Sequence, residues 1–352
     1  MCLASCSSVN PYYDPAQPHH TQKGFRNLNA GFTPGTLDML RWRYERWSEN
    51  LPPPPREPVV GVPGDVPFLH ETSNAIRMTW IGHSTLLMQI GDFNLLTDPM
   101  FSDRASPISF MGGHRRLQPP GVALADLPRI DVVVISHNHY DHLDLASVRA
   151  LAAQKGGPPV FAVPLGVELW FRDNVSPSLD LRALDWWQQT VVKDVALTLT
   201  PAQHWSQRTL FDRNETLWGG WAVRARNPDF NFLFGGDSGY WDGFRATGER
   251  LGPFDLAALP IGAYLPRWFM RYAHMDPTEA VRSRDDLKAK AAMGVHWGTF
   301  TLTDEAPDQP PRDLAKARTE AGLGEADFFV MRHGETRILQ NGQWTIHRPA
   351  AR

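Results

Sequence analysis

The segment SHNHYDHLD at residues 136–144 constrains this chain most, because it places three histidines and an aspartate directly after the apolar run DVVVI. Side chains alternate along an extended chain, so His137 and His139 point the same way. A turn within the loop would direct Asp141 and His142 elsewhere. One ion with four ligands from so short a loop is therefore geometrically awkward. Two adjacent ions, each taking two ligands from the loop, are easier to accommodate.

A single histidine after a strand is usually a hydrogen-bonded loop residue, and several histidines of this chain fit that simpler explanation. Three imidazoles crowded into six positions do not fit it, because they would repel one another when protonated, and a shared metal removes that problem. We therefore interpret the segment as a metal site. The simpler explanation is kept for His19, His20, His70, His114, His333 and His347.

Further ligands for two ions must come from distant parts of the chain. His204, Asp237 and His296 each follow an apolar run, at the point where a predicted strand ends. The only cysteines, Cys2 and Cys6, stand at the extreme N-terminus, which leaves histidine and carboxylate ligands for the body. Such a set suits two Zn²⁺ ions. Imidazole also suits iron and nickel, so the identity of the metal is open.

Short strand-like runs recur from about residue 75, in two series with helical stretches between some of them. This pattern predicts a layered α/β sandwich. Asp144 is expected to cap a helix that ends before Gly156, and Asp276 a helix that continues to about Lys290. The first series comprises residues 75–81, 84–91, 93–98 and 131–136, and the second comprises residues 159–164, 195–200, 219–225, 231–237, 255–262 and 291–298.

Residues 1–70 differ from this pattern and are predicted to form a loop-rich extension, in which LPPPPREP at 51–58 is a stiff spacer. The predicted main domain then covers residues 71–352. Within the extension, one apolar stripe recurs at helical spacing beside several arginines, which is compatible with a helix at a membrane surface. We favour a helix docked on the body of the protein instead. The stripe consists of Leu37, Leu40, Tyr44 and Trp47.

Composition narrows the possible partners and location. The 352 residues carry a net charge of −3, so no basic balance points to nucleic acid. No run of about 18 apolar residues predicts a transmembrane helix. Leu3-Ala4-Ser5-Cys6 resembles the end of a bacterial lipoprotein signal, although only two residues precede it. The expected location is a bacterial envelope, with membrane anchoring if Cys6 is lipidated, and the alternative is the cytoplasm.

The motif His137-x-His139-x-Asp141-His142 resembles the signature of the metallo-β-lactamase superfamily, whose fold is an αββα sandwich with a dinuclear site between the sheet edges. A wider resemblance covers roughly residues 70–340. The segments TDPMFSDRASP, LDWWQQ, TPAQHWSQRTLFD, HMDPTEAVR and VHWGTF are similar to those of the N-acylphosphatidylethanolamine-hydrolysing phospholipase D family. The fold expected from this resemblance is α/β, an αββα metallo-β-lactamase sandwich with a loop-rich N-terminal extension.

The resemblance also implies a role for each candidate ligand. It places one zinc on His137, His139 and His204, and the other on Asp141, His142 and His296, with Asp237 bridging the two. Asp98 matches a buried aspartate that orients a ligand. His83 has either a similar role or that of a hydrogen-bonded core histidine.

The activity implied is hydrolysis of N-acylphosphatidylethanolamine to N-acylethanolamine and phosphatidate. Two ions about 3.5–4 Å apart acidify a shared water, and the resulting hydroxide attacks phosphorus. Asp141 is the candidate proton shuttle to the leaving group. His274 is a candidate catalytic residue and phosphodiester contact, and Tyr140 and Arg208 are candidate substrate contacts. A loop histidine bonded to the backbone is the alternative for His274.

Other substrates and partners are compatible with the same residues. A different phosphodiester or a sugar-phosphate lactone is the second enzymatic hypothesis, and a metal-stabilised lipid-binding module is the non-enzymatic one. The expected partners are a phospholipid and a membrane surface, and a homodimer is possible. The apolar window at residues 264–270 would then line an acyl groove, or else belong to the core.

Overall fold

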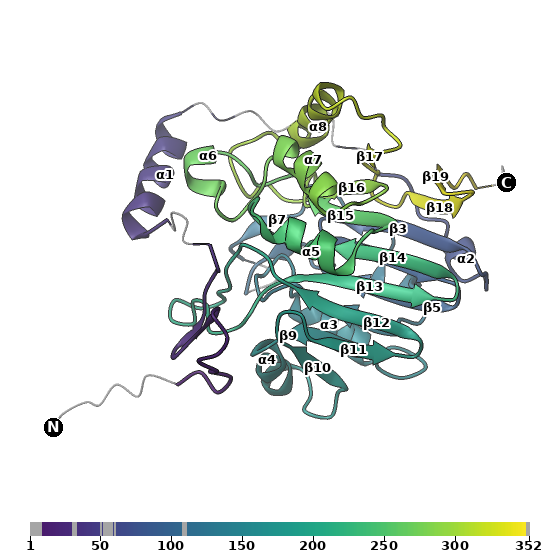
Figure 1. Cartoon of the computed structure of the whole chain (residues 1–352), viewed down its shortest axis with the longest axis horizontal. Coiled ribbons are helices and arrows are strands. Elements are labelled where there is room, and N and C mark those ends of the chain that lie inside the picture. The colour runs from purple at the N-terminus through teal and green to yellow at the C-terminus, as the bar shows by residue number, and fades with distance from the viewer. Residues whose placement is uncertain are drawn as a thin grey trace.

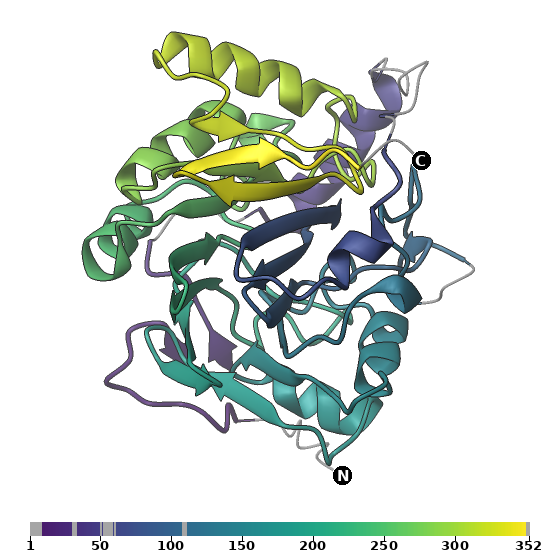
Figure 2. The ribbon, with the colours of Figure 1, turned by 90° about the vertical axis from the view of Figure 1, so that its right-hand side faces the viewer.

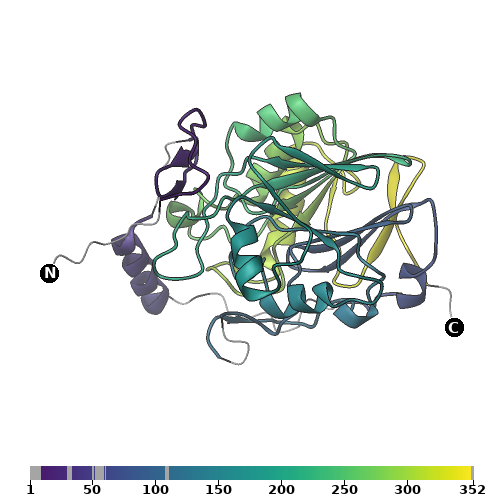
Figure 3. The same cartoon turned by 90° about the horizontal axis from the view of Figure 1, so that it is seen from below.

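The computed structural model describes residues 9–29, 34–49, 51, 59, 61–107 and 111–349. Two large β-sheets pack face to face in the described residues, with helices on both outer faces (Figures 1 and 3). The αββα sandwich expected from the resemblance is confirmed. Cys2, Cys6 and residues 52–58 of the proline-rich segment lie outside the described residues.

The first sheet has the strand order β10-β9-β8-β5-β4-β3-β18-β19 (Figure 2). Strands β5, β8, β9 and β10 run parallel, and the others pair antiparallel. The predicted run at 159–164 opens the second series along the chain, yet it pairs with β8 in this sheet. The strands are β3 (Ile76–Gly82), β4 (Thr85–Ile90), β5 (Phe93–Thr97), β8 (Val132–Val134), β9 (Val160–Pro164), β10 (Leu181–Leu184), β18 (Thr336–Gln340) and β19 (Gln343–Ile346).

The second sheet follows the chain from β11 to β17 without a crossover in order. Its strands pair antiparallel from β11 to β14 and parallel from β14 to β17. These strands are β11 (Gln189–Val192), β12 (Val195–Thr200), β13 (Gly220–Arg226), β14 (Asp229–Phe234), β15 (Leu256–Pro260), β16 (Ala292–Val295) and β17 (Phe328–Phe329). Two small hairpins are formed by β1 (His20–Thr21) with β2 (Gly24–Phe25), and by β6 (Arg104–Ala105) with β7 (His114–Arg115).

The continuous apolar run before the histidine cluster is explained by burial on both faces of the first sheet. Val132 and Val134 belong to the core between the two sheets, whereas Val133 and Ile135 pack with the helices outside the first sheet. Side chains alternate along a strand, so a strand covered on both sides needs apolar residues at every position. The run therefore ends, and polar residues begin, where β8 leaves the sandwich.

Helices cover the outer face of each sheet, and two of them begin at the predicted caps. Asp144 accepts a hydrogen bond from Ser147 N–H, and Asp276 accepts one from Glu279 N–H. The helix after Asp276 stops at residue 286 rather than near 290, because Lys288 has a left-handed φ of 54°. The helices are α1 (Thr36–Ser48), α2 (Val66–Leu69), α3 (Leu145–Ala152), α4 (Val167–Asn174), α5 (Gly243–Leu251), α6 (Arg267–Met270), α7 (Pro277–Asp286), α8 (Gln309–Glu320) and the 3-10 turn η1 (Leu124–Asp126).

Helix α1 is docked on the body, but not through its predicted apolar stripe. Trp42 stacks on Phe269 of α6 with ring centroids 5.0 Å apart, and its indole N–H donates to Asp304. The stripe faces outward instead, with Leu37 81% and Trp47 82% exposed. None of the helices in the described residues is long and apolar enough to cross a membrane.

Candidate metal centre

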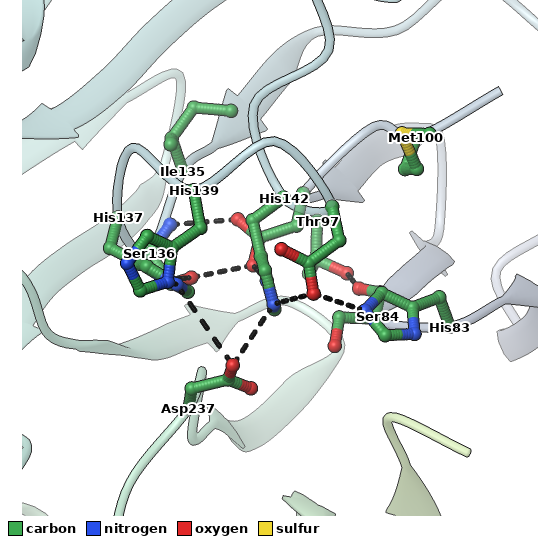
Figure 4. A network of polar contacts seen from close by, with 12 residues as sticks. His83, Ser84, Thr97, Met100, Ile135, Ser136, His137, His139, His142 and Asp237 are labelled. Carbon is green, nitrogen blue, oxygen red and sulfur yellow. Dashed lines mark hydrogen bonds and ion pairs between the residues drawn. The ribbon is translucent and has the colours of Figure 1, made fainter. Parts of the chain in front are cut away.

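The predicted ligands lie together because they follow strands that end at the same edge of the sandwich. In the first sheet β5 and β8 are parallel, and in the second sheet β12 runs parallel to β14 and β16 through the antiparallel strand β13. The loops after these strands therefore meet at one edge, as ligand sites of α/β sheets do. Figure 4 shows side chains from both sheets converging there.

The loop after β8 is folded by its own hydrogen bonds. The N–H groups of His142 and Leu143 donate to the carbonyl oxygen of His139, at 3.1 and 2.8 Å. These bonds close a turn that separates the ligand-type residues of the loop. His137 and His139 lie in one group of possible ligands, and Asp141 and His142 lie in another.

The first group joins His137 and His139 to His204, which follows β12. Nε2 of His137 lies 2.8 Å from Nδ1 of His139, and Nε2 of His204 lies 3.3 Å from the same atom. Nδ1 of His137 lies 2.9 Å from Ser136 Oγ. Nδ1–H of His204 donates to the Ala273 carbonyl at 3.0 Å. His137 and His204 therefore carry their ring protons on Nδ1, and their Nε2 lone pairs point toward His139. This arrangement suits one cation.

The second group contains Asp141, His142 and His296, which follows β16. Nε2 of His142 and Nε2 of His296 each lie 3.4 Å from Asp141 Oδ2. Behind them, His83 Nε2 lies 3.0 Å from the same carboxylate oxygen and holds its orientation. With His83, the group brings three imidazoles and a carboxylate within reach of one another, which suits a second cation.

Asp237, after β14, faces one histidine of each group, His137 and His142 (Figure 4). Its Oδ2 atom is 3.1 Å from His142 Nε2 and 3.2 Å from His296 Nε2. The same oxygen is 3.9 Å from His137 Nε2 and 3.8 Å from His204 Nε2. One carboxylate thus faces both groups, as a bridging ligand would.

Several buried polar atoms of this cluster have no hydrogen-bond partner within the described part of the chain. They include Oδ1 of Asp237, Nδ1 of His296 and Nε2 of His139. A buried polar atom without a partner is unfavourable, so groups of this kind are normally satisfied by an ion or by water. The residues therefore fit a pair of metal ions.

Asp98, after β5, controls the proton on one imidazole. Its Oδ2 accepts from Ser136 Oγ and lies 2.6 Å from His142 Nδ1, while its Oδ1 accepts from Ser136 N–H at 2.7 Å. The proton of His142 is thereby held on Nδ1, which leaves Nε2 free to face the centre. Ser136 links Asp98 to His137 and was not singled out in the sequence. Its position directly before His137 was the only local feature that could have indicated this role.

Three residues at this edge adopt left-handed backbone angles, with φ of 54° at His83, 31° at Asp98 and 62° at His296. Such angles are unfavourable for residues with a Cβ and persist where surrounding contacts fix them. Here they direct three side chains inward from the ends of their strands.

Burial determines the charge of the first group. Burial is the main reason why the pKa of His137 and that of His204 lie well below the ordinary value. Burial also lowers the pKa of His139 to about 4. The three imidazoles are therefore neutral at pH 7 and keep their lone pairs.

The second group has the opposite preference. Burial opposes a charge on His142 and His296, but the carboxylates of Asp237 and Asp141 raise the pKa of His296 to about 9 and that of His142 well above its ordinary value. A cation bound by these carboxylates would replace the protons, so binding of metal is expected to release protons.

His274 lies beside both groups. Its Nδ1 atom is 4.0 Å from Asp237 Oδ2 and has no hydrogen-bond partner among the described residues. Its ring meets that of His204 edge to face at 5.1 Å. Burial lowers the pKa of His274 to about 4, so the ring is neutral at pH 7.

Tyr140 and Arg208, the other predicted substrate contacts, are engaged with the ligand loop. The Tyr140 hydroxyl donates to the Arg208 carbonyl at 2.9 Å. Nη1 of Arg208 donates to the carbonyls of Asn138 and Leu143 at 2.7 and 2.8 Å. The guanidinium also stacks on Tyr140 at 4.0 Å and on Trp170 at 4.7 Å. These contacts hold both ends of the loop.

The apolar window at 264–270 faces α1 and the interior. Arg41 of α1 lies 4.3 Å over the Trp268 ring, and Phe269 stacks on Trp42. Tyr264 is buried and donates its hydroxyl to Asp313. Much of this window is therefore occupied by contacts within the protein.

Comparison with known proteins identifies the family. The model of the beta-lactamase superfamily domain matches residues 93–297. The N-acyl-phosphatidylethanolamine-hydrolyzing phospholipase D 1 of Caenorhabditis elegans is 37% identical over 91% of this chain and 94% of its own length. The chain belongs to the N-acylphosphatidylethanolamine-hydrolysing phospholipase D family of the metallo-β-lactamase superfamily.

Two further matches extend this result. An uncharacterised protein of Mycobacterium tuberculosis is 40% identical over 86% of this chain and 80% of its own length. A possible metal-dependent hydrolase of Veillonella parvula shares the fold, with a TM-score of 0.58 at 18% identity over 74% of this chain and 98% of that chain. This member of the N-acylphosphatidylethanolamine-hydrolysing phospholipase D family is a metal-dependent hydrolase. Its two sheets form the metallo-β-lactamase fold.

Proposed function

We propose that this protein is a dinuclear zinc phosphodiesterase that hydrolyses N-acylphosphatidylethanolamine to N-acylethanolamine and phosphatidate. The observation that carries the proposal is the single Asp237 oxygen lying within 4 Å of imidazoles from both ligand groups. The worm relative, which matches nearly end to end, is named for hydrolysis of this lipid.

The ligand set divides between the two ions. His137, His139 and His204 would hold one ion, and Asp141, His142 and His296 the other, with Asp237 shared. Two bound ions of this kind supply an acidified water and neutralise charge on the phosphodiester. The chain's own residues hold the imidazoles in the required tautomers, through Asp98, Ser136 and the Ala273 carbonyl.

His274 and Asp141 are assigned the remaining chemical roles. A neutral His274 has an unpartnered ring nitrogen 4.0 Å from Asp237 Oδ2, so it faces the space where a phosphodiester would bind. It would orient that group by a hydrogen bond. Asp141 stays ionised, because His142 and His296 lower its pKa well below the usual value against the opposing effect of burial. As the assigned proton shuttle, this carboxylate would take the proton released by the attacking water only transiently and pass it to the leaving alkoxide.

The exposed apolar residues around the site suit a phospholipid bilayer. Leu210 and Phe211, on the loop that begins with His204, are 86% and 89% exposed. Helix α1, with its outward-facing stripe, projects from the same side of the molecule (Figures 1 and 3). Large apolar side chains grouped at one face mark a membrane or partner surface. We propose that this face lies on the bilayer that holds the substrate.

The test of the activity is to incubate zinc-loaded protein with N-acylphosphatidylethanolamine and identify the products by mass spectrometry. N-acylethanolamine with phosphatidate is the expected result, and Asp237→Ala should abolish it. If a soluble phosphodiester or a sugar-phosphate lactone is hydrolysed faster, that compound class replaces the lipid. No turnover with two ions bound contradicts the proposal.

Vesicle sedimentation tests the membrane face. Leu210→Ser with Phe211→Ser should reduce binding to phospholipid vesicles, whereas Val191→Ser, at an exposed apolar position on β11, should not. Equal binding of both variants would contradict the assignment. Loss of self-association instead of vesicle binding would assign this face to a second copy of the chain.

A further inference from the structure

One side chain of the N-terminal extension, Asn27, is bonded directly to the backbone of a predicted metal ligand. Its Nδ2 donates to the His204 carbonyl at 2.7 Å, and its Oδ1 accepts from the His204 N–H at 3.1 Å. One amide thus satisfies both backbone polar groups of the residue, as a neighbouring strand would. The two residues are 177 positions apart in the sequence.

The second donor and the second acceptor site of the Asn27 amide also form hydrogen bonds. Nδ2 also donates to the Tyr272 hydroxyl at 2.7 Å, and Oδ1 also accepts from the Trp218 indole N–H at 3.2 Å. Two donors and two acceptor sites are the full capacity of a side-chain amide. Tyr272 directly precedes Ala273, whose carbonyl accepts the ring proton of His204. Asn27 therefore supports both the backbone of His204 and the segment that orients its imidazole.

The extension holds Asn27 in place through contacts of its own. Phe25 is 2% exposed within the main core, and its N–H donates to the Asn214 carbonyl at 2.8 Å. The chain passes so closely here that a Cβ on Gly24 would lie 2.0 Å from that carbonyl oxygen. The amide is consequently positioned by the fold and does not depend on a bound ion.

We propose that Asn27 is a positioning residue of the metal centre, which raises the affinity of the ion held by His137, His139 and His204. The inference rests on the proposed dinuclear function. Without the amide, the N–H and carbonyl of His204 lose their partner and its ring is less firmly directed. Loss of such a supporting contact typically weakens metal binding by about 10–100-fold.

The experiment compares Asn27 with Asn29, an exposed asparagine that lines the same surface pocket of about 450 Å³. The metal-free full-length protein is titrated with Zn²⁺ against a chromogenic chelator, for the unaltered chain and for Asn27→Ala, Asn27→Asp, Asn29→Ala and Asn29→Asp. Asn27→Asp keeps the shape and the acceptors but removes both donors. Titration with Co²⁺ reports the coordination of each ion by its absorption spectrum, and calorimetry gives the Tm of each metal-free variant.

We expect both Asn27 variants to bind one of the two Zn²⁺ equivalents about 10–100-fold more weakly. The Co²⁺ absorption spectrum of that equivalent should also change. The Asn29 variants should match the unaltered chain. Unchanged affinities in the Asn27 variants would overturn the proposal. Equal weakening of both equivalents together with a lower Tm of the metal-free protein would also overturn it, since that result indicates general structural support. The stoichiometry of the unaltered chain tests the dinuclear function separately.

Discussion

At the scale of single residues, the centre depends on which nitrogen of each imidazole carries the proton. Ser136, Asp98 and a backbone carbonyl hold the protons of His137, His142 and His204 on Nδ1. Nε2 of His137 and of His204 then faces Nδ1 of His139, and Nε2 of His142 faces the carboxylates of Asp141 and Asp237, an arrangement that a cation would stabilise. The buried histidine cluster is thus organised by Ser136, Asp98 and a backbone carbonyl, none of which is a predicted ligand.

Replacing Asp98 should therefore disturb the centre without removing a ligand. Asp98→Asn presents an amide N–H where Ser136 and His142 both need an acceptor, so His142 loses its fixed tautomer. We expect metal affinity to fall about 10–100-fold, measured by competition with a chelator. The exposed Asp92→Asn is the matched control. Affinity equal to that of the control would refute the orienting role.

His274 is expected to act on substrate rather than on metal. His274→Ala should lower kcat about 10²–10³-fold, the usual loss when one preorganised donor is removed, with two ions still bound. His274→Gln keeps an N–H donor and should recover part of the rate. The measurement is steady-state kinetics with metal analysis on the same samples. Loss of an ion in His274→Ala would make this residue a ligand instead.

At the scale of elements, the strand order and the hydrogen bonds between loops hold the predicted ligands in position. Arg208, on the loop after β12, donates to two carbonyls of the loop after β8, and so joins the two sheets at the site edge. Its pKa is lowered to about 10 chiefly by burial, which still leaves the guanidinium charged at pH 7. Both of these bonds come from Nη1, while the planar guanidinium stacks on Tyr140 and Trp170, which an ammonium group cannot do in the same way.

Arg208→Lys should consequently destabilise the metal-free protein by about 2–3 kcal/mol, because the stacking on two rings and the geometry of the charge-assisted hydrogen bonds are lost. Urea unfolding measures the change. Arg213→Lys, at an arginine on the same loop that stacks on Trp205, is the control. A raised KM with unchanged unfolding would instead support the substrate contact expected from the resemblance.

At the scale of the whole molecule, the described residues 9–29 of the N-terminal extension contact the sandwich. Two buried histidines, His19 and His20, meet the carboxylate of Asp185 at 2.6 and 3.1 Å. This group has the composition of a metal site. However, Asp14 N–H donates to Nδ1 of His20 at 3.1 Å, so the ring proton lies on Nε2 and points at the carboxylate. The contact is a hydrogen-bonded latch between the extension and the sandwich.

The latch predicts a pH dependence of stability. Burial opposes ionisation of Asp185, but the hydrogen bond and charge of His19, with Trp186 N–H and His20, lower its pKa below the ordinary 3.8. Stability from a lowered carboxyl pKa is fully present above about pH 4 and is lost as the pH falls through the folded-state pKa. Asp185→Asn should cost about 1–3 kcal/mol at pH 7 by losing a buried acceptor.

Unfolding curves of the two proteins from pH 7 to pH 2 check this expectation. The difference between them should narrow below about pH 4. A constant difference over this range, or no difference at pH 7, would show that the latch does not involve an ionised Asp185.

Much of the sandwich was predictable, because strand patterns and helix caps are local. All ten predicted runs contain strands, and Asp144 and Asp276 cap helices as expected. Of the strands in the two large sheets, β10, β11, β17, β18 and β19 were missed. They are short and mostly partly exposed apart from β17, so they lack the continuous apolar pattern of β3 or β8.

The sequence by itself determined which residue types stand at the ends of the buried strands, because burial on both faces requires apolar runs and leaves polar residues at their ends. It also predicted a metal site at the loop 136–144, with two ions easier to accommodate than one. The bridging position of Asp237 was expected from the resemblance. Only the tertiary structure decided that α1 turns its apolar stripe outward and that Asn27 supports His204. These contacts join residues far apart in the chain, and they depend on strand order and sheet packing, which local spacing does not encode.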